Sequence, residues 1–189
     1  MVRSDFAWQD FAWARSIHHF ARGIGAARSG QIDRALQELA VIETLQRDLS
    51  DTSLVYWREE VQVHVDVVRS WTLMVQGEES EALRLASASA DRQDAVDKHP
   101  VTPGEVLPVR ELYADMLLEA GENEEALKQY QIVLEGSPNR LNALLGAATA
   151  AAEGGDTALA DRYYAVVRDQ TRSGNRQRIG LGRAWATSR

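Results

Sequence analysis

Four histidines are the side chains of this 189-residue chain that are best suited to metal binding or acid–base chemistry. Glu60 and His64 lie four positions apart, so a helix would place them on one face, a spacing that can support a metal ion or a proton transfer. His18 or His99, on a neighbouring segment, could complete a site with three ligands. The competing interpretation is a solvated Glu60–His64 pair. We favour that interpretation, so we expect no bound metal and no cofactor.

Standard motifs of enzymes are absent from the sequence. It contains no H-E-x-x-H, G-x-S-x-G or phosphate-loop motif. It also has no cysteine, which excludes a thiol nucleophile and a thiolate metal site. We therefore expect a non-catalytic protein. The alternative is an enzyme, or a protein that binds a metal or a small molecule, and that uses Glu60 and His64 with His18 or His99.

The chain is acidic overall, but its C-terminal end is basic. Its net charge is −7, but residues 172–189 contain five arginines and no acid, so the remaining residues carry −12. Such an acidic body repels phosphate backbones, and we expect no nucleic-acid partner. No stretch is long and apolar enough to span a membrane. The absence of cysteine fits a reducing compartment, so we expect a cytoplasmic location.

A short sequence motif occurs four times and indicates which secondary-structure elements position these side chains. Each copy has a glycine, then a polar or acidic residue, then an alanine five positions after the glycine, with amphipathic stretches on both sides. Such self-similarity is typical of proteins built from repeated pairs of helices. The first three glycines are expected to take the left-handed conformation that ends a helix. The copies contain Gly30 and Ala35, Gly77 and Ala82, Gly121 and Ala126, and Gly155 and Ala160.

The 3.6-residue hydrophobic period predicts about eight helices, which form four antiparallel pairs in one domain over residues 1–171. Residues 172–189 are expected to form a basic tail or a short capping helix. The repeat glycines are 47, 44 and 34 residues apart, so the first helix in each of the first two pairs is unusually long. The alternating valines of 61–67 resemble a strand, but they lie inside a helical segment and we predict helix there. The predicted pairs are 5–28 and 31–48, 53–76 and 79–97, 106–120 and 123–135, and 140–153 and 156–171.

Small residues at fixed distances from the repeat glycines make the chain similar to the tetratricopeptide-repeat family. The residue seven positions before each glycine is small, as is the alanine five positions after it. The resemblance covers most of the chain, and it implies an all-α fold in which about four helix pairs stack into a right-handed superhelix. Small side chains at these positions let paired helices cross at close distance. The residues seven positions before the glycines are Gly23, Ser70, Ala114 and Ala148.

A second resemblance lies between the second and third helix pairs. The run HPVTPG at residues 99–104, with LP at 107–108 and REL at 110–112, is similar to a phrase in longer bacterial tetratricopeptide proteins of unassigned activity. This resemblance implies that the chain corresponds to their C-terminal part. The residues themselves indicate a rigid connector, with Pro103 at the first position of a helix.

The tetratricopeptide pattern also implies a concave groove that is lined by the first helix of each pair, ten, six and three residues before each repeat glycine. The lining is apolar and aromatic in the first two pairs and mostly acidic in the third. We therefore expect a scaffold that binds a peptide or protein partner, through a basic or apolar segment of that partner more readily than an acidic one. The alternative is that the long helices cover this face themselves. The groove residues are Phe20, Ile24, Val67, Trp71, Met74, Glu111, Asp115 and Leu118.

The N-terminal segment carries aromatic residues on more than one side of its predicted helix. Such a helix needs a cover, which could be the long third helix, a second copy of the chain or a region that precedes it. We favour the third helix. A second copy is the next choice, and it makes a homodimerising structural module the other functional alternative. The aromatic residues are Phe6, Trp8, Phe11, Trp13 and Phe20.

Overall fold

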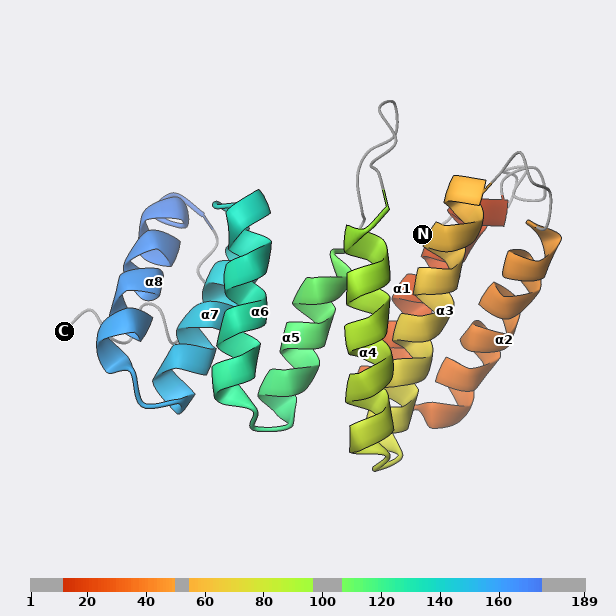
Figure 1. Cartoon of the computed structure of the whole chain (residues 1–189), viewed down its shortest axis with the longest axis horizontal. Coiled ribbons are helices and arrows are strands. Elements are labelled where there is room, and N and C mark those ends of the chain that lie inside the picture. Colours follow the sequence, from red (N-terminus) through yellow and green to blue (C-terminus); the bar gives the residue numbers. More distant parts are fainter. Residues whose placement is uncertain (1–11, 50–54, 97–106, 175–189) are drawn as a thin grey trace. The chain divides into compact units, whose positions relative to one another are not determined.

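The regular elements of the described residues are all helices, which confirms the predicted all-α class (Figure 1). This computed structural model describes residues 12–49, 55–96 and 107–174. Several predicted features lie outside the described residues. They are His99 with its HPVTPG run, the aromatic residues before residue 12 and the basic tail after residue 174.

Contacts group the chain into two compact units, with the boundary between Val109 and Arg110. Most predicted helix ends lie within one residue of the ends found, but the fourth helix ends at Asp94, three residues before the predicted end, and the fifth begins at Val109, three residues after the predicted start. The helices of the first unit are α1 (Ala12–Arg28), α2 (Ile32–Asp48), α3 (Val55–Val75) and α4 (Glu79–Asp94). Those of the second are α5 (Val109–Glu119), which begins at the boundary, α6 (Asn123–Gly136), α7 (Leu141–Glu153) and α8 (Thr157–Gln170).

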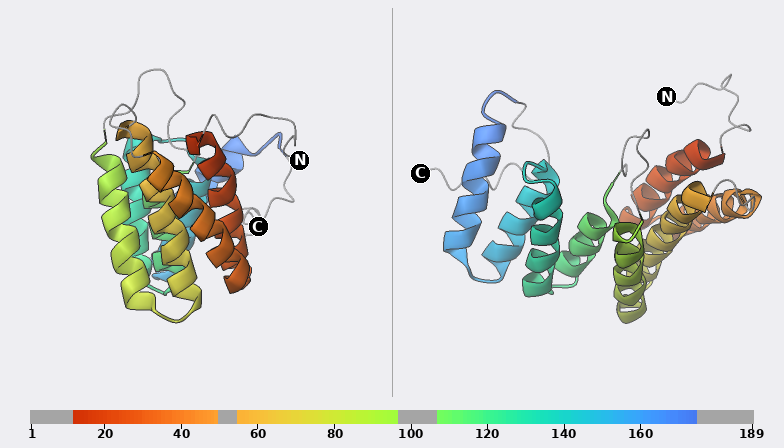
Figure 2. Two further views of the ribbon diagram at one scale, coloured as in Figure 1. Left: turned by 90° about the vertical axis from the view of Figure 1, so that its right-hand side faces the viewer. Right: turned by 45° about the horizontal axis from the view of Figure 1, so that its top comes forward.

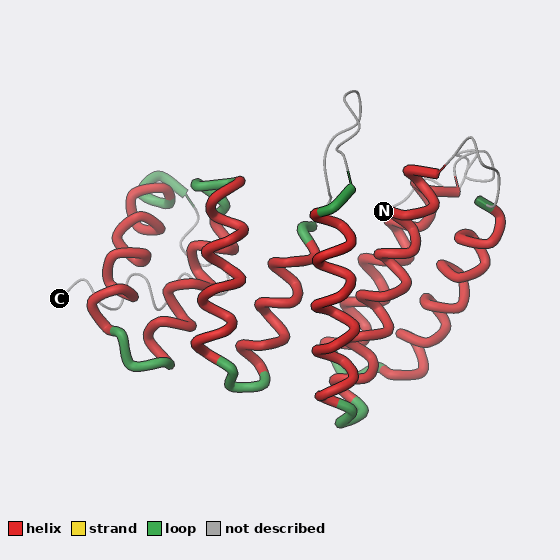
Figure 3. Tube along the Cα trace, viewed as in Figure 1, coloured by secondary structure: helices red, strands yellow, loops and turns green. Residues whose placement is uncertain are grey.

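The two helices of each pair are joined by a three-residue turn with glycine in the middle (Figure 3). In the first turn the Gly30 N–H donates to the Ala27 carbonyl and the Gln31 N–H donates to the Ala26 carbonyl, both at 2.9 Å. The other three turns repeat this pair of bonds, which is the Schellman arrangement. The predicted left-handed glycines are confirmed. The φ angles are 72° at Gly30, 87° at Gly77, 81° at Gly121 and 90° at Gly155.

Helix α3 packs against α1, α2 and α4 (Figure 2). Every residue from Val63 to Val68 is buried, so no side of this stretch faces water. Valine is a modest helix former, but packing of this kind outweighs intrinsic propensity. The predicted helix over 61–67 is therefore confirmed, and α3 is the helix around which the first unit is built.

The small residues of the repeat are all buried, as close helix packing requires. Gly23 is the clearest case. A Cβ placed there would lie 2.9 Å from both Val68 Cγ atoms, closer than van der Waals contact allows. This contact joins α1 to α3, so Gly23 serves the packing of successive pairs and not only the crossing within a pair that the family pattern implies.

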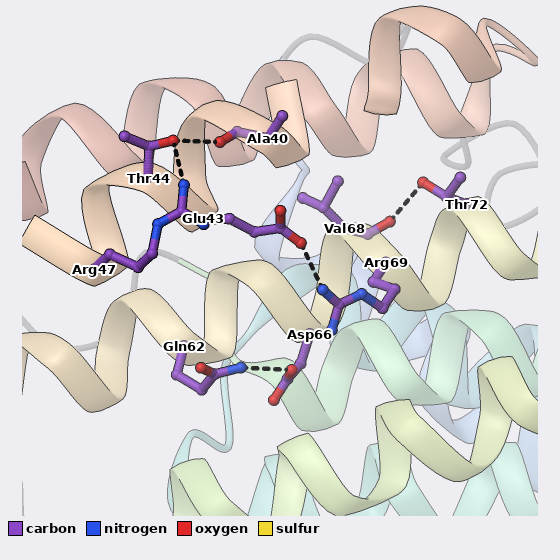
Figure 4. Close-up of polar contacts among 9 residues, drawn as sticks. All are labelled: Ala40, Glu43, Thr44, Arg47, Gln62, Asp66, Val68, Arg69 and Thr72. Atoms are coloured by element: carbon purple, nitrogen blue, oxygen red, sulfur yellow. Dashed lines mark hydrogen bonds and ion pairs between the residues drawn. The ribbon is translucent and has the colours of Figure 1, made fainter. Parts of the chain in front are cut away.

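An arginine–carboxylate pair connects α3 to α2 (Figure 4), and a second pair connects α3 to α4. Arg69 of α3 donates to Glu43 of α2 at 2.6 Å. Asp66 of α3 is buried and accepts from Gln62 at 2.8 Å. The other carboxylate oxygen of Asp66 accepts from Arg92 of α4, also at 2.8 Å. These directional hydrogen bonds and ion pairs supplement the apolar packing of α3 against its neighbours.

The second unit contains an apolar core formed by α7 and α8, with α6 packed against it. Gly146 of α7 allows the Tyr130 ring of α6 to lie directly on the α7 backbone. A Cβ at this glycine would lie 2.2 Å from the ring. The buried core residues are Leu144, Ala148, Ala151, Ala160, Tyr164 and Val167.

Candidate functional site

The predicted groove residues of the first unit lie mostly in its interior. Phe20 and Trp71 are each 1% exposed, Val67 is 2% exposed and Ile24 is 7% exposed. Met74 is half-buried. A partner could contact the four buried side chains only after the surrounding structure moved. In this conformation they line no open groove.

Trp71 is held by packing and by a cation. The Arg28 guanidinium carbon lies 4.6 Å from the centre of the indole ring, a favourable cation–π distance. The indole Nε1 is buried and has no hydrogen-bond partner in the part of the chain that the structure describes. An unpaired buried donor costs free energy, so the apolar contacts of this ring must outweigh that cost.

The predicted acidic residues of the groove already have partners within the second unit. Glu111 is 2% exposed and accepts from Arg140 through both Nε and Nη2, the latter at 3.0 Å. Asp115 accepts from the Tyr130 hydroxyl at 2.6 Å. Leu118, the remaining groove residue here, is half-buried. These bonds join α5 to α6 and to the residue before α7, so the two carboxylates contribute to packing.

Aromatic side chains of α1 lie on α3. The Trp13 and Trp57 rings are stacked with centroids 4.0 Å apart and planes inclined by 17°. The Phe20 ring stacks on the His64 imidazole at 4.3 Å. The favoured prediction, that the long third helix covers the aromatic face of the first, is therefore confirmed for Trp13 and Phe20.

His64 is buried at this contact between α1 and α3. Its Nδ1 lies 3.0 Å from Ser16 Oγ, which itself donates to the Trp13 carbonyl at 2.6 Å. Because a hydroxyl has one proton, the Nδ1–H of His64 then donates to Oγ. Burial lowers the pKa of His64 to about 4, so the imidazole is neutral near pH 7.

The surroundings of His64 differ from those of a catalytic or metal-binding histidine. An activated serine would donate its proton to the imidazole and would reach a substrate, whereas Ser16 is fully buried and donates to a backbone carbonyl. His18 follows Ser16 by two positions, about 200° around α1, so it points away from His64. Glu60 is half-buried on α3, but His64 is buried, so the favoured prediction of a solvated Glu60–His64 pair is wrong. Within residues 12–49, 55–96 and 107–174, no three histidine or acidic side chains form a group that could hold a metal ion.

A buried ion-pair cluster between α1 and α2 was missed in the sequence. Glu38 of α2 is 5% exposed. One of its oxygens lies 2.6 Å from His19 Nδ1, and the other lies 2.6 Å from a guanidinium nitrogen of Arg22. The sequence contains a trace of this cluster, because Glu38 follows Ala35 by three positions and therefore lies on the buried side of its helix.

An open depression on the second unit was also missed. It has a volume of about 390 Å³ and is bordered by α6, α7 and α8. Its apolar surface comes from Leu134, Pro138, Leu144 and Tyr163, and its polar rim comes from Gln131 and Glu135. Gln131 donates to the Tyr163 hydroxyl at 3.3 Å, which links α6 to α8 beside the hollow. No spacing along a single helix indicates such a site, because three helices build it.

Comparisons with known proteins give no relative. No family model matches the chain, and no curated protein or solved structure is significantly similar to it. None of the described helices has the length and apolar character that crossing a membrane requires.

Proposed function

We propose that this protein is a tetratricopeptide-like helical-repeat module that binds a partner protein without catalysing a reaction. Three observations support this proposal. The four turns have the same hydrogen bonds, the small residues at fixed distances from the turn glycines are buried, and α3 packs on both helices of the preceding pair. Helical repeats of this kind commonly present binding surfaces. The aromatic residues expected to anchor a partner are interior, so another surface must make the contact.

The observation that carries the proposal is the depression between α6 and α8. It combines exposed apolar surface with the carboxylate of Glu135 on its rim. Its lining joins apolar side chains to polar groups that can fix the orientation of a ligand. We propose that an extended segment of the partner places an apolar side chain against Tyr163 and Pro138, and a lysine or arginine near Glu135. This keeps the expected partner chemistry, basic or apolar, but moves the site.

The test compares variants of the rim with a matched control. The purified chain is used to capture partners from cell extract, and the affinity of a captured protein is then measured by calorimetry with both components purified. We expect Glu135→Lys and Tyr163→Ala each to weaken binding about tenfold or more. Asp161→Lys makes the same change of charge at an exposed residue of α8 that does not border the depression, and it should bind normally. Equal affinity of all four proteins would refute the site.

We also propose that the protein works in the cytoplasm of a bacterial cell. The absence of cysteine is consistent with a reducing compartment, and the resemblance of the HPVTPG region to bacterial tetratricopeptide proteins suggests the source. Cell fractionation with an antibody against the chain tests the location. Recovery in an extracytoplasmic fraction would contradict it.

A further inference from the structure

Helix α1 is basic, although the chain as a whole is acidic. It contains three arginines, two histidines and no acidic residue, whereas the whole chain carries a net charge of −7. Four of these groups, Arg15, His18, His19 and Arg22, follow the spacing i, i+3, i+4 and i+7. That spacing places them along a single face of the helix, over about 10 Å of its length.

Only part of this positive charge is neutralised. Glu38 accepts from both His19 and Arg22, so its two oxygens are already engaged. Arg15 is exposed and His18 is half-buried, and neither has a hydrogen-bond or ion-pair partner in the described part of the chain. By contrast, Arg69 and Arg92, which join helices of the same unit, pair with the carboxylates of Glu43 and Asp66.

The surroundings of His18 on this face lower its affinity for a proton. The pKa of His18 is lowered, first by burial, then by the neighbouring His19 and Arg22. The attraction of Glu38, which raises the pKa, is the smallest of the four influences. At pH 7 His18 is therefore mainly uncharged and offers a hydrogen-bond donor, while Arg15 and Arg22 carry the positive charge of this face.

We propose that the face of α1 formed by Arg15, His18 and Arg22 binds an acidic segment of a protein partner. Arginine takes carboxylates in two parallel hydrogen bonds. An extended chain rises about 3.3 Å per residue, so two acidic side chains about three residues apart span the distance between Arg15 and Arg22. This surface differs from the depression on α6 and α8 in position and in the charge it selects, and it does not depend on the proposed function.

The experiment uses two labelled peptides and the whole protein. One peptide repeats Glu-Gly-Gly, and the other replaces each glutamate by glutamine. Binding is measured by fluorescence anisotropy at low salt, where exposed charges are least screened. We expect the glutamate peptide to bind and the glutamine peptide not to bind. Arg15→Glu should weaken binding of the glutamate peptide by about tenfold or more.

Arg162→Glu is the matched control. It changes the net charge by the same amount at an exposed arginine of α8, and it should alter the affinity by less than about twofold, since Arg162 does not belong to the proposed face of α1. Equal weakening by both variants would show a response to net charge alone and would overturn the proposal. Absence of binding, or tighter binding of an oligothymidine than of the glutamate peptide, would overturn it as well. Glu135→Lys, which tests the depression, should leave this binding unchanged.

Discussion

The imidazole of His64 is neutral because it is buried between α1 and α3, and this makes the stability of the first unit depend on pH. The folded protein holds the pKa of His64 at about 4, below the ordinary value of 6.5 that the unfolded chain has. Between these two values the unfolded state binds the proton more readily. Stability from this residue is thus complete above pH 6.5 and is lost as the pH falls towards 4.

We expect the free energy of unfolding to fall by about 2 kcal/mol between pH 7 and pH 5 because of His64 alone. Urea titrations at both pH values measure the change in the wild type and in His64→Gln, which keeps a hydrogen-bond donor but does not titrate. The fall should be smaller in the variant by that amount. The same pH dependence in both proteins would mean that His64 is not the group responsible.

At the scale of the elements, the contact between α6 and α7 depends on a missing side chain. The Tyr130 ring lies where a Cβ of residue 146 would be, at 2.2 Å. We expect Gly146→Ala to destabilise the protein by about 1–3 kcal/mol, because the ring or the helix must move.

The control for this change is Gly25→Ala, also within a helix. No atom lies within 4 Å of a Cβ at Gly25, so alanine should stabilise α1 by about 0.5–1 kcal/mol. Thermal unfolding followed by circular dichroism measures both. A neutral or stabilising Gly146→Ala would contradict the packing described for Tyr130.

The helices and turns could be predicted from the sequence because their causes are local. The sequence alone shows all of these causes. They are a glycine that must adopt positive φ, small residues at fixed distances from it and a hydrophobic period of 3.6 residues. Gly121 and the helix that ends before it illustrate this, because the prediction and the structure differ by one residue at that end.

The surroundings of the candidate residues could not be predicted, because they depend on which helices meet. Glu111 was predicted to be a carboxylate of the groove. Instead it accepts a hydrogen bond from Arg140, which lies 29 positions later in the sequence. Trp71 was predicted to line the groove, yet it is 1% exposed. The depression beside Tyr163 needs three helices to exist. Helical spacing shows which side chains share a face but not what covers that face.

At the scale of the whole molecule, the described surface contains little exposed apolar residue area of the kind that holds two copies together. The exposed large hydrophobic residues are scattered over four helices, which is normal for a monomer. They are Leu36, Val55, Val75, Ile132 and Val166, between 40% and 46% exposed.

We therefore expect a variant that begins at residue 12 to sediment as a monomer at high protein concentration. The full chain, with Phe6, Trp8 and Phe11 present, is compared with it by analytical ultracentrifugation. A dimer formed only by the full chain would locate self-association in the first 11 residues and support the homodimer alternative. A dimer formed by the shortened chain would contradict the prediction from the described surface.

The four matching turns have a consequence for how such a chain can change length. Each turn follows the last residue of one helix, contains the same two hydrogen bonds and is three residues long, after which the next helix begins. If the stretch from one turn glycine to the next were duplicated, the copy would begin and end at turns with the same backbone conformation. Residues 122–155, a copy of 34 positions that ends on Gly155, are the shortest such stretch. The chain could therefore lengthen by tandem duplication of a helix pair. Such a duplication would add binding surface without requiring a new type of turn between the helices.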